Sequence, residues 1–251
     1  MSRRVVTLVL SAFLAAGLAL GSTTLVVPYV ALGPGEIRDT LGTVDGKPVI
    51  DVAGAQTYPT SGRLFMPTVS VTDELTLLDA AQMWLSPRFA LAPREQIFPA
   101  DKTFQQVQQE NAQAFTGSQS VAEAAARTYL KPQSPIRVTV NIKDIGGPSA
   151  GLVFALTIVD KLTPGDLLHG MSVAGTGEIS QDGKVGSIGG IRMKMIAAKE
   201  VGATVFLSPA DNCKEATQTV PDGLRLVRVS TLTEAVDALT ALAAGRDAPG
   251  C

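Results

Sequence analysis

The stretch GGPSAGLVFALTIVDKL at residues 146–162 joins a glycine-rich turn to a run of apolar residues. The turn, GGPSAG at 146–151, consists of small residues and one proline, which favour a sharp change of direction. The apolar run that follows is long enough for a helix. We therefore predict an apolar helix from about Ala150 to Leu162.

Strand and helix signals alternate on both sides of this turn, throughout residues 136–251. Alternating apolar residues from Ile136 to Ile142 predict a half-buried strand that leads into the turn. The same reading predicts strands at 171–174, 204–207 and 224–229, a hairpin turn at Asp182-Gly183, and helices at 191–201 and from a Thr231/Glu234 capping box to about Ala244. This order of elements predicts an α+β or α/β domain with a mixed sheet.

Residues 36–130 combine short strands, at 49–52 and 69–71, with two helical stretches. The helices are expected from Leu75 to Leu85 and from Phe104 to Leu130, the second with a solvated face of charged and amide residues. The sequence KPQSP at 131–135 ends the second helix. The expected organisation is an anchor with its flanks at 1–35, an N-terminal region at 36–130, a linker at 131–135 and a domain at 136–251.

The N-terminus carries a long apolar segment. No charged residue occurs between Arg4 and Glu36, and Val5 to Val27 is almost wholly apolar up to the Gly33-Pro34-Gly35 break. About 20 apolar residues suffice to cross a bilayer as a helix. Arginines precede the span and no basic cluster follows it, so the N-terminus is expected in the cytoplasm. We predict a single-pass protein of the cell membrane whose folded part is extracytoplasmic.

A cleaved signal peptide is the alternative, with Ala19-Leu20-Gly21 as a small-residue cleavage site. Both interpretations export the folded part to an oxidising compartment. Cys213 and Cys251 are able to form the one disulfide that two cysteines allow there, and two free thiols are the alternative.

Composition excludes several classes of function. A formal net charge of −2 argues against nucleic acid as a partner. One histidine and no C-x-x-C pair argue against a metal site, and the chain has no G-x-x-x-x-G-K-[ST] motif for ATP. We expect no cofactor. The single histidine is His169, and the chain contains no G-x-S-x-G nucleophile-elbow motif with which it could form a catalytic triad. We therefore expect an ordinary buried or rim histidine without a catalytic role.

Ser149 and Lys194 are the residues that suggest chemistry. Ser149 stands where a helix N-cap would stand, but small neighbours and helix N–H groups also suit a nucleophile. Without a catalytic histidine, lysine is the leading alternative base. Lys194 lies between Met193 and Met195 on a predicted amphipathic helix, where burial would lower its pKa. A lysine whose amine reaches solvent is the alternative interpretation.

Three motifs in one order resemble the proteolytic domain of Lon proteases. GGPSAG at 146–151 resembles the nucleophile motif, with Ser149 in the serine position. AGTGEI at 174–179 and GKVGSIGGIRMKMIAA at 183–198 resemble the stretch that carries the catalytic lysine, at Lys194. GATVFLSPADN at 202–212 resembles the strand and loop that follow. The right order and spacing make the resemblance specific from Gly146 to Asn212.

The chain resembles more closely the bacterial membrane-anchored Lon-like proteases that carry a PDZ domain. The similar parts are the N-terminal span, ALGPG at 31–35 and NAQAFTGSQSVAEAAARTYL at 111–130. Two features depart from these families. Only residues 131–135 stand where the PDZ domain should fall. Other Lon proteases have an acidic residue three positions before the serine, where this chain has Gly146, so that role is absent or is taken by Asp144.

The resemblance implies an α+β Lon proteolytic domain of the ribosomal protein S5 domain 2-like fold. It also implies an ATP-independent serine endopeptidase acting on unfolded or membrane-proximal polypeptides, with Ser149 as nucleophile and Lys194 as general base. N–H groups around Gly147 and Ser149 are candidates for an oxyanion hole, and Thr176 for orienting Lys194. A homo-oligomeric ring is implied as well. The main alternative is a non-catalytic, membrane-anchored peptide-binding or envelope scaffold domain.

Overall fold

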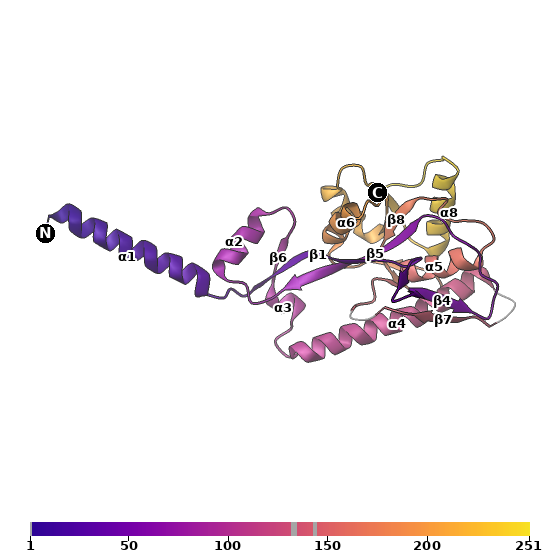
Figure 1. Ribbon diagram of the computed structural model, residues 1–251, viewed down its shortest axis with the longest axis horizontal. Coiled ribbons are helices and arrows are strands. Elements are labelled where there is room, and N and C mark those ends of the chain that lie inside the picture. The colour runs from indigo at the N-terminus through magenta and orange to yellow at the C-terminus, as the bar shows by residue number, and fades with distance from the viewer. Residues whose placement is uncertain (1, 132–134, 143–144) are drawn as a thin grey trace. The chain divides into compact units, whose positions relative to one another are not determined.

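The computed structural model of the chain describes residues 2–131, 135–142 and 145–251 (Figure 1). Its internal contacts divide the chain into two compact units. The first unit comprises Met1–Gly33 and Ser70–Thr103, and the second comprises Pro34–Val69 and Phe104–Cys251. Two strands, β1 (Tyr29–Asp39) and β5 (Arg63–Thr72), run from one unit into the other.

A mainly parallel sheet organises the second unit. Strand β5 pairs in parallel with β8 (Ser172–Gly175), which pairs in parallel with β11 (Val205–Pro209). Strand β12 (Arg225–Val229) continues this parallel order on the outer side of β11, and β1 lies next to β5. All five residues of β11 are buried, as expected for a central parallel strand covered on both faces.

Alternate residues of β11 pack into two separate cores. Val205 and Leu207 belong to a large apolar cluster with residues of helices α4 (Phe104–Leu130), α5 (Gly151–Leu162) and α8 (Leu232–Ala243). Phe206, between them, packs with residues of α6 (Ile191–Glu200) and α7 (Cys213–Ala216). The sheet therefore separates two layers of helices, and the mixed arrangement confirms the predicted α+β class.

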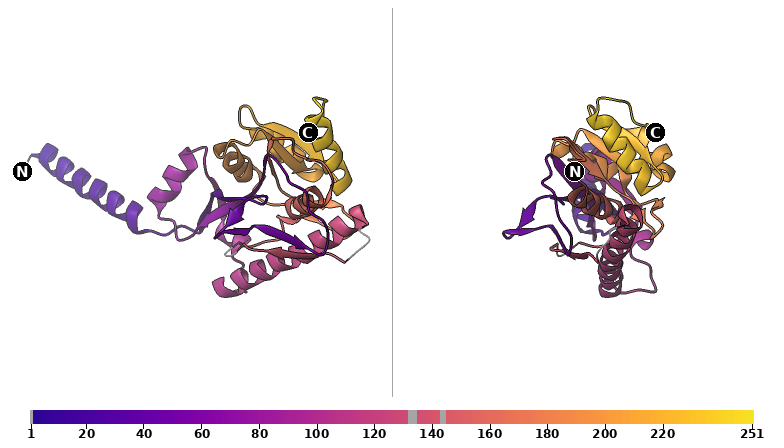
Figure 2. Two further views of the ribbon diagram at one scale, coloured as in Figure 1. Left: turned by 45° about the vertical axis from the view of Figure 1, so that its right-hand side comes forward. Right: turned by 90° about the vertical axis from the view of Figure 1, so that its right-hand side faces the viewer.

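Helix α5 is the apolar helix predicted from the opening stretch, and the structure shows that it is buried. Residues 151–160 are all buried, because α4 covers one side and the sheet the other (Figure 2). The rings of Phe115 in α4 and Phe154 in α5 meet edge to face, with centroids 5.6 Å apart. Ala122, Ala125 and Ala126 bring α4 close to the core. Only part of α4 is thus the solvated face that its charged residues predict.

These contacts divide the chain differently from the boundaries predicted from the sequence. Residues 34–69 and 104–130 pack with the C-terminal part, whereas the prediction grouped them in a separate region at 36–130. The physical reason is non-local: β5 pairs with β8 at Leu64↔Val173, and α4 buries its alanines against α5. Of the expected linker at 131–135, residues 132–134 lie outside the described residues.

Short elements complete the second unit. The predicted hairpin turn at Asp182-Gly183 joins β9 (Glu178–Ile179) to β10 (Val185–Gly186), with Gly183 at φ 83°. Strand β4 (Ile50–Ala53) pairs antiparallel with β7 (Arg137–Val140). The remaining elements are β2 (Thr43–Val44), β3 (Lys47–Pro48) and the 3-10 turns η1 (Ala210–Asn212) and η2 (Thr217–Thr219).

The first unit contains α1 (Arg3–Thr24), α2 (Leu77–Leu85), β6 (Ala90–Pro93) and α3 (Arg94–Ile97). Helix α1 is long and apolar enough to cross a membrane and is unburied, a test that a signal sequence also passes. The helix ends at Thr24, before the predicted Gly33-Pro34-Gly35 break, which lies inside strand β1. That prediction was wrong because β1 pairs with β6 up to Leu32↔Ala90 and continues beside β5, where Gly35 lies against the backbone of Thr68 and Val69.

Candidate active site

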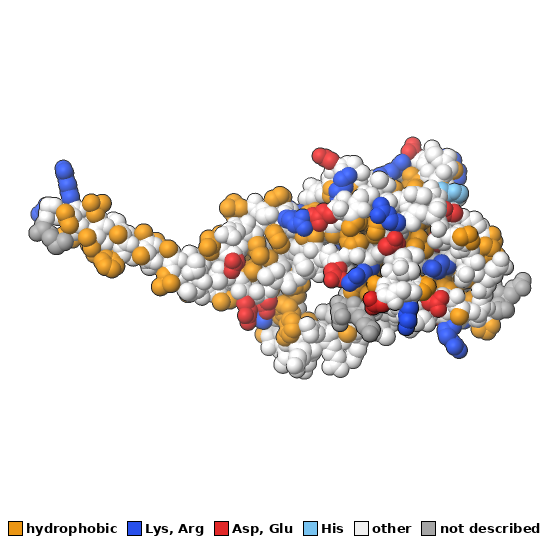
Figure 3. Space-filling view, viewed as in Figure 1, with side chains coloured by type: hydrophobic (Ala, Val, Ile, Leu, Met, Phe, Trp, Pro, Cys, Tyr) orange, Lys and Arg blue, Asp and Glu red, His pale blue; other side chains and the backbone are white. Residues whose placement is uncertain are grey.

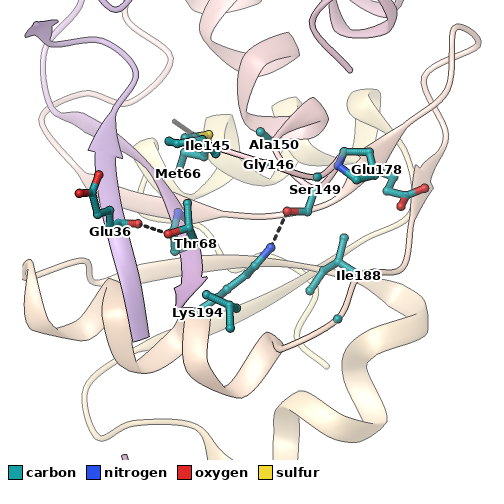
Figure 4. A pocket seen from close by; sticks show the side chains of 15 residues that line it. Glu36, Met66, Thr68, Ile145, Gly146, Ser149, Ala150, Glu178, Ile188 and Lys194 are labelled. Atoms are coloured by element: carbon teal, nitrogen blue, oxygen red, sulfur yellow. Dashed lines mark hydrogen bonds between the residues drawn. The ribbon is translucent and has the colours of Figure 1, made fainter. Parts of the chain in front are cut away.

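An open pocket of about 340 Å³ lies in the second unit (Figure 4). Its lining comes from four segments that are far apart in the sequence: the second half of β1, β5, the loop before α5, and the stretch from β9 to α6. Ser149 and Lys194 face each other inside it. The other side chains that Figure 4 labels are Glu36, Met66, Thr68, Ile145, Ala150, Glu178 and Ile188.

Ser149 is held by the turn before α5. Its carbonyl oxygen accepts two hydrogen bonds, from the N–H of Gly177 at 2.9 Å and from the hydroxyl of Thr176 at 3.1 Å. A side chain at Gly151 would meet Ile179, since a Cβ there would lie 2.8 Å from its Cγ2. The N-cap of α5 is Ala150, which makes no side-chain cap bond, so the structure does not support the capping role for Ser149.

Lys194 reaches the serine from the first turns of α6. Gly190 precedes this helix at φ 71°, and a Cβ there would lie 2.7 Å from Cγ2 of Val69, so glycine suits the position on both counts. The Lys194 side chain is buried, and Nζ lies 2.6 Å from Oγ of Ser149. Lys194 is therefore not the solvent-reaching lysine of the alternative interpretation.

Burial changes the acid–base properties of this lysine. Desolvation lowers the pKa of Lys194 from 10.5 to about 8, because a buried ammonium loses its hydration. Its neighbours in the helix, Met193 and Met195, are buried as well. A neutral amine is thus accessible near physiological pH, which a general base requires.

Thr176 connects the two residues. Its Oγ1 accepts a hydrogen bond from Nζ of Lys194 at 3.0 Å and donates one to the carbonyl oxygen of Ser149 at 3.1 Å. Thr176 is itself buried, so its rotamer is fixed by packing and by these two bonds. The structure brings Ser149, Lys194 and Thr176 together as the sequence reasoning expected, whereas their chemical roles remain proposals.

Replacing Thr176 with valine should lower kcat of a reaction that uses Ser149 and Lys194 by roughly ten- to a hundredfold, because the amine loses the group that orients it. The change also removes an acceptor that stabilises the ammonium, so the pKa of Lys194 falls and the acidic limb of the pH–rate profile moves to lower pH. Thr176→Ser keeps the hydroxyl and should restore both. Unchanged turnover in a folded Thr176→Val protein would contradict this positioning role.

The N–H of Gly147, which the sequence suggested as an oxyanion-hole donor, has another partner in the structure. Gly147 has φ 88° and donates its N–H to the carbonyl oxygen of Asn111 in α4, at 2.8 Å. That donor is therefore occupied. Within the described ranges, the N–H groups of Ser149 and Ala150 make no hydrogen bond, so they are the better candidates. Sequence reasoning missed Asn111 because α4 carried no local signal of a role in the site.

The other candidates fall elsewhere. Asp144 lies outside the described residues. His169 is exposed at φ 46° and lines a different pocket, apart from the serine and lysine. Cys213 and Cys251 are joined by a disulfide, with their Cα atoms 5.1 Å apart. Among the described residues, no group of three or more His, Cys, Asp or Glu side chains is arranged to hold a metal ion.

The fold and the site together define a class of protein: an α+β domain with a serine hydroxyl against a buried lysine amine in an open pocket. The chain belongs to the Lon protease family, because residues 106–243 match the Lon protease (S16) C-terminal proteolytic domain. This match begins within α4, in agreement with the packing of that helix on α5. It supports a serine protease function.

Individual relatives agree with the family match. The chain is 39% identical over 93 residues to a Lon protease of Neorickettsia sennetsu, covering 36% of this chain and 11% of that protein. It is 35% identical over 94 residues to Lon protease 1 of Bacillus subtilis, covering 36% and 12%. It is 31% identical over 115 residues to the mitochondrial Lon protease homolog of Mus musculus, covering 41% and 12%. The chain thus spans only a small part of the length of these relatives.

Proposed function

We propose that this protein is a membrane-anchored serine endopeptidase that cleaves unfolded or membrane-proximal polypeptides through Ser149 and Lys194. The observation that carries the proposal is the contact of 2.6 Å between Oγ of Ser149 and Nζ of a buried lysine. Serine is a weak nucleophile until a neighbouring base removes its proton. A lysine with its pKa lowered to about 8 is such a base.

In the proposed reaction, Oγ of Ser149 attacks the carbonyl carbon of a peptide bond while neutral Nζ of Lys194 takes the hydroxyl proton. The carbonyl oxygen becomes an oxyanion near the N–H groups of Ser149 and Ala150. The ammonium of Lys194 then gives its proton to the leaving amine, and the C–N bond breaks. Water, deprotonated by the same amine, hydrolyses the acyl-enzyme and regenerates Ser149.

The proposed substrates are unfolded or membrane-proximal polypeptides, which an open pocket accepts as extended chains. The proposal includes an activity that needs no ATP and that does not extend to the forced unfolding of stable substrates. The proposed anchor, α1, keeps the protease on the extracytoplasmic side of the cell membrane, where the Cys213–Cys251 disulfide is stable. A homo-oligomeric ring belongs to the same proposal and rests on the family match alone.

Casein cleavage without nucleotide tests the proposal through its pH dependence. Below pH 8 most of Lys194 is protonated, so kcat/KM should rise about tenfold per pH unit toward a plateau above pH 8. The sign follows from the lowered pKa, since only the neutral amine accepts the serine proton. The expected midpoint lies near 8, well below the ordinary lysine value of 10.5. A profile with no rise between pH 6 and pH 9 would exclude Lys194 as the base.

A further inference from the structure

Exposed large apolar side chains are concentrated in one part of the chain. They occur on α1, on the connection that follows it, at Tyr29 at the start of β1 and on α2, and among the described residues only Val71 and Phe104 lie elsewhere. The second unit, apart from Phe104, presents none within its described residues. Figure 3 shows hydrophobic side chains along α1 and continuing onto the neighbouring part of the first unit. The surfaces of soluble proteins rarely gather apolar side chains in this way, and such patches mark interaction sites.

Backbone hydrogen bonds connect the start of α2 to the residues that follow the candidate membrane span α1. The N–H of Val27 donates to the carbonyl oxygen of Leu75 at 2.9 Å, and the N–H of Leu77 donates to that of Leu25 at 3.0 Å. Val26 and Thr76 form an antiparallel bridge between these bonds. Thr76 is also the N-cap of α2 and forms a capping box with Asp79. The first turn of α2 therefore lies beside the residues that leave α1.

Helix α2 has one covered side and one open apolar side. Ala80 and Met83 pack inward in a small cluster with Leu75. Four apolar side chains are exposed: Leu77 by 49%, Leu78 by 40%, Trp84 by 74% and Leu85 by 76%. Leu77 and Leu78 lie two turns from Trp84 and Leu85, so the four share one side of the helix. We call these four residues the outer face of α2.

We propose that the outer face of α2 is a membrane-docking surface, with its side chains in the interfacial region of the same bilayer that α1 crosses. The inference rests on the proposed anchoring by α1. A bilayer is the occupant that continuity indicates, because the face begins at residues hydrogen-bonded to the end of the span. Leucines gain by leaving water, and tryptophan is enriched at membrane interfaces. This contact would hold the first unit on the membrane surface instead of leaving it on a free stalk.

Trp84 offers a direct measurement, since it is the only tryptophan in the chain. The full-length protein is reconstituted into phosphatidylcholine vesicles with and without lipids brominated near the glycerol backbone. Trp84 should emit at shorter wavelength than tryptophan in water, and the brominated lipid should remove roughly half or more of its emission, as expected for an interfacial indole. Iodide added to the water should quench it weakly.

Charge on the outer face tests the contact further. The double variant Leu78→Asp with Leu85→Asp should lose most of the quenching by brominated lipid, because carboxylates oppose entry into the interface. The matched control places two aspartates at Val71 and Thr72, which are exposed in the same unit but outside the outer face, and should retain it. Equal quenching in the parent and the outer-face variant would overturn the proposal.

The remaining outcomes separate the docking surface from the anchor. Resistance to carbonate extraction reports whether α1 is inserted, independently of Trp84. An inserted protein whose Trp84 is quenched by iodide and not by brominated lipid overturns the docking surface and leaves the anchor intact. Short-wavelength emission without quenching by brominated lipid also overturns it, since the face is then covered by protein. Release by carbonate removes the anchor, and the docking surface fails with it.

Discussion

Replacing Ser149 with alanine is expected to lower the rate of casein cleavage by on the order of 10⁴-fold or more, because no other group supplies the attacking oxygen. The fold should survive. The Ser149 side chain accepts one hydrogen bond from Lys194, and the amine keeps its bond to Thr176 after the change. The loss of one such bond to a charged donor costs about 1.5–3 kcal/mol of unfolding free energy.

The measurement is cleavage of fluorescently labelled casein by the full-length protein, with circular dichroism and thermal unfolding as checks on folding. Ser180→Ala is the matched control, because Ser180 lies just after β9 and bonds Asp182 instead of Lys194. The control should retain normal turnover. Cleavage that persists in the Ser149→Ala protein would rule out the serine peptidase and return the non-catalytic scaffold to consideration, with the activity assigned to a contaminant.

Replacing Lys194 with methionine is expected to abolish cleavage to a similar degree while making the protein more stable at pH 7. Methionine has a similar length and no charge, and it would join Met193 and Met195 in their buried surroundings. A pKa lowered from 10.5 to about 8 corresponds to roughly 3 kcal/mol of unfavourable burial when the lysine is protonated. Lys194→Met removes this unfavourable contribution, and we expect its free energy of unfolding at pH 7 to rise by on the order of 1–3 kcal/mol.

The pH dependence of this stabilisation has a definite sign. The folded pKa lies below the unfolded value, so the lysine opposes folding fully below pH 8 and ceases to do so as pH rises toward 10.5. The stability difference between Lys194→Met and the parent should therefore shrink between pH 8 and pH 10.5. Urea unfolding of the full-length protein in detergent, followed across this range, measures it.

Lys199→Met is the matched control for this experiment. Lys199 lies on the same helix α6 but is exposed and does not line the pocket. The control should retain normal cleavage and should not gain the stability expected of Lys194→Met. A Lys194→Met protein that retains cleavage, or whose stability relative to the parent is independent of pH, would contradict the assignment of Lys194 as a buried base.

Local patterns in the sequence predicted most of the helices and strands of the second unit. The apolar run after GGPSAG is the buried helix α5, and the alternation near Ile136 is strand β7. Such signals are readable because helix and strand periods depend on neighbours within a few residues. The boundary of α2 was less accurate: the helix starts at Leu77 and not at Leu75, since Thr76 provides the cap.

Contacts between segments far apart in the sequence could not be predicted from these local patterns. The carbonyl oxygen of Asn111 accepts a hydrogen bond from the N–H of Gly147. Asn111 lies in α4, whose amphipathic pattern indicates a buried face but not the elements that this face contacts. The outer face of α2 is a similar case. The spacing of its leucines predicts an apolar side, but that side is exposed and the helix buries Ala80 instead. Which side of a helix is covered depends on the elements packed beside it.

The sequence by itself determined the identities of the serine and the lysine, the family that their motifs resemble, and the apolar segment at the N-terminus. Only the tertiary structure decided that Oγ and Nζ meet at 2.6 Å, that Thr176 bonds both partners, and that residues 34–69 and 104–130 belong with the C-terminal part. The reason is physical. Residue types and periods are properties of short segments, whereas a contact across 45 residues, and the desolvation that lowers the lysine pKa, arise only when the sheet and its helices pack together.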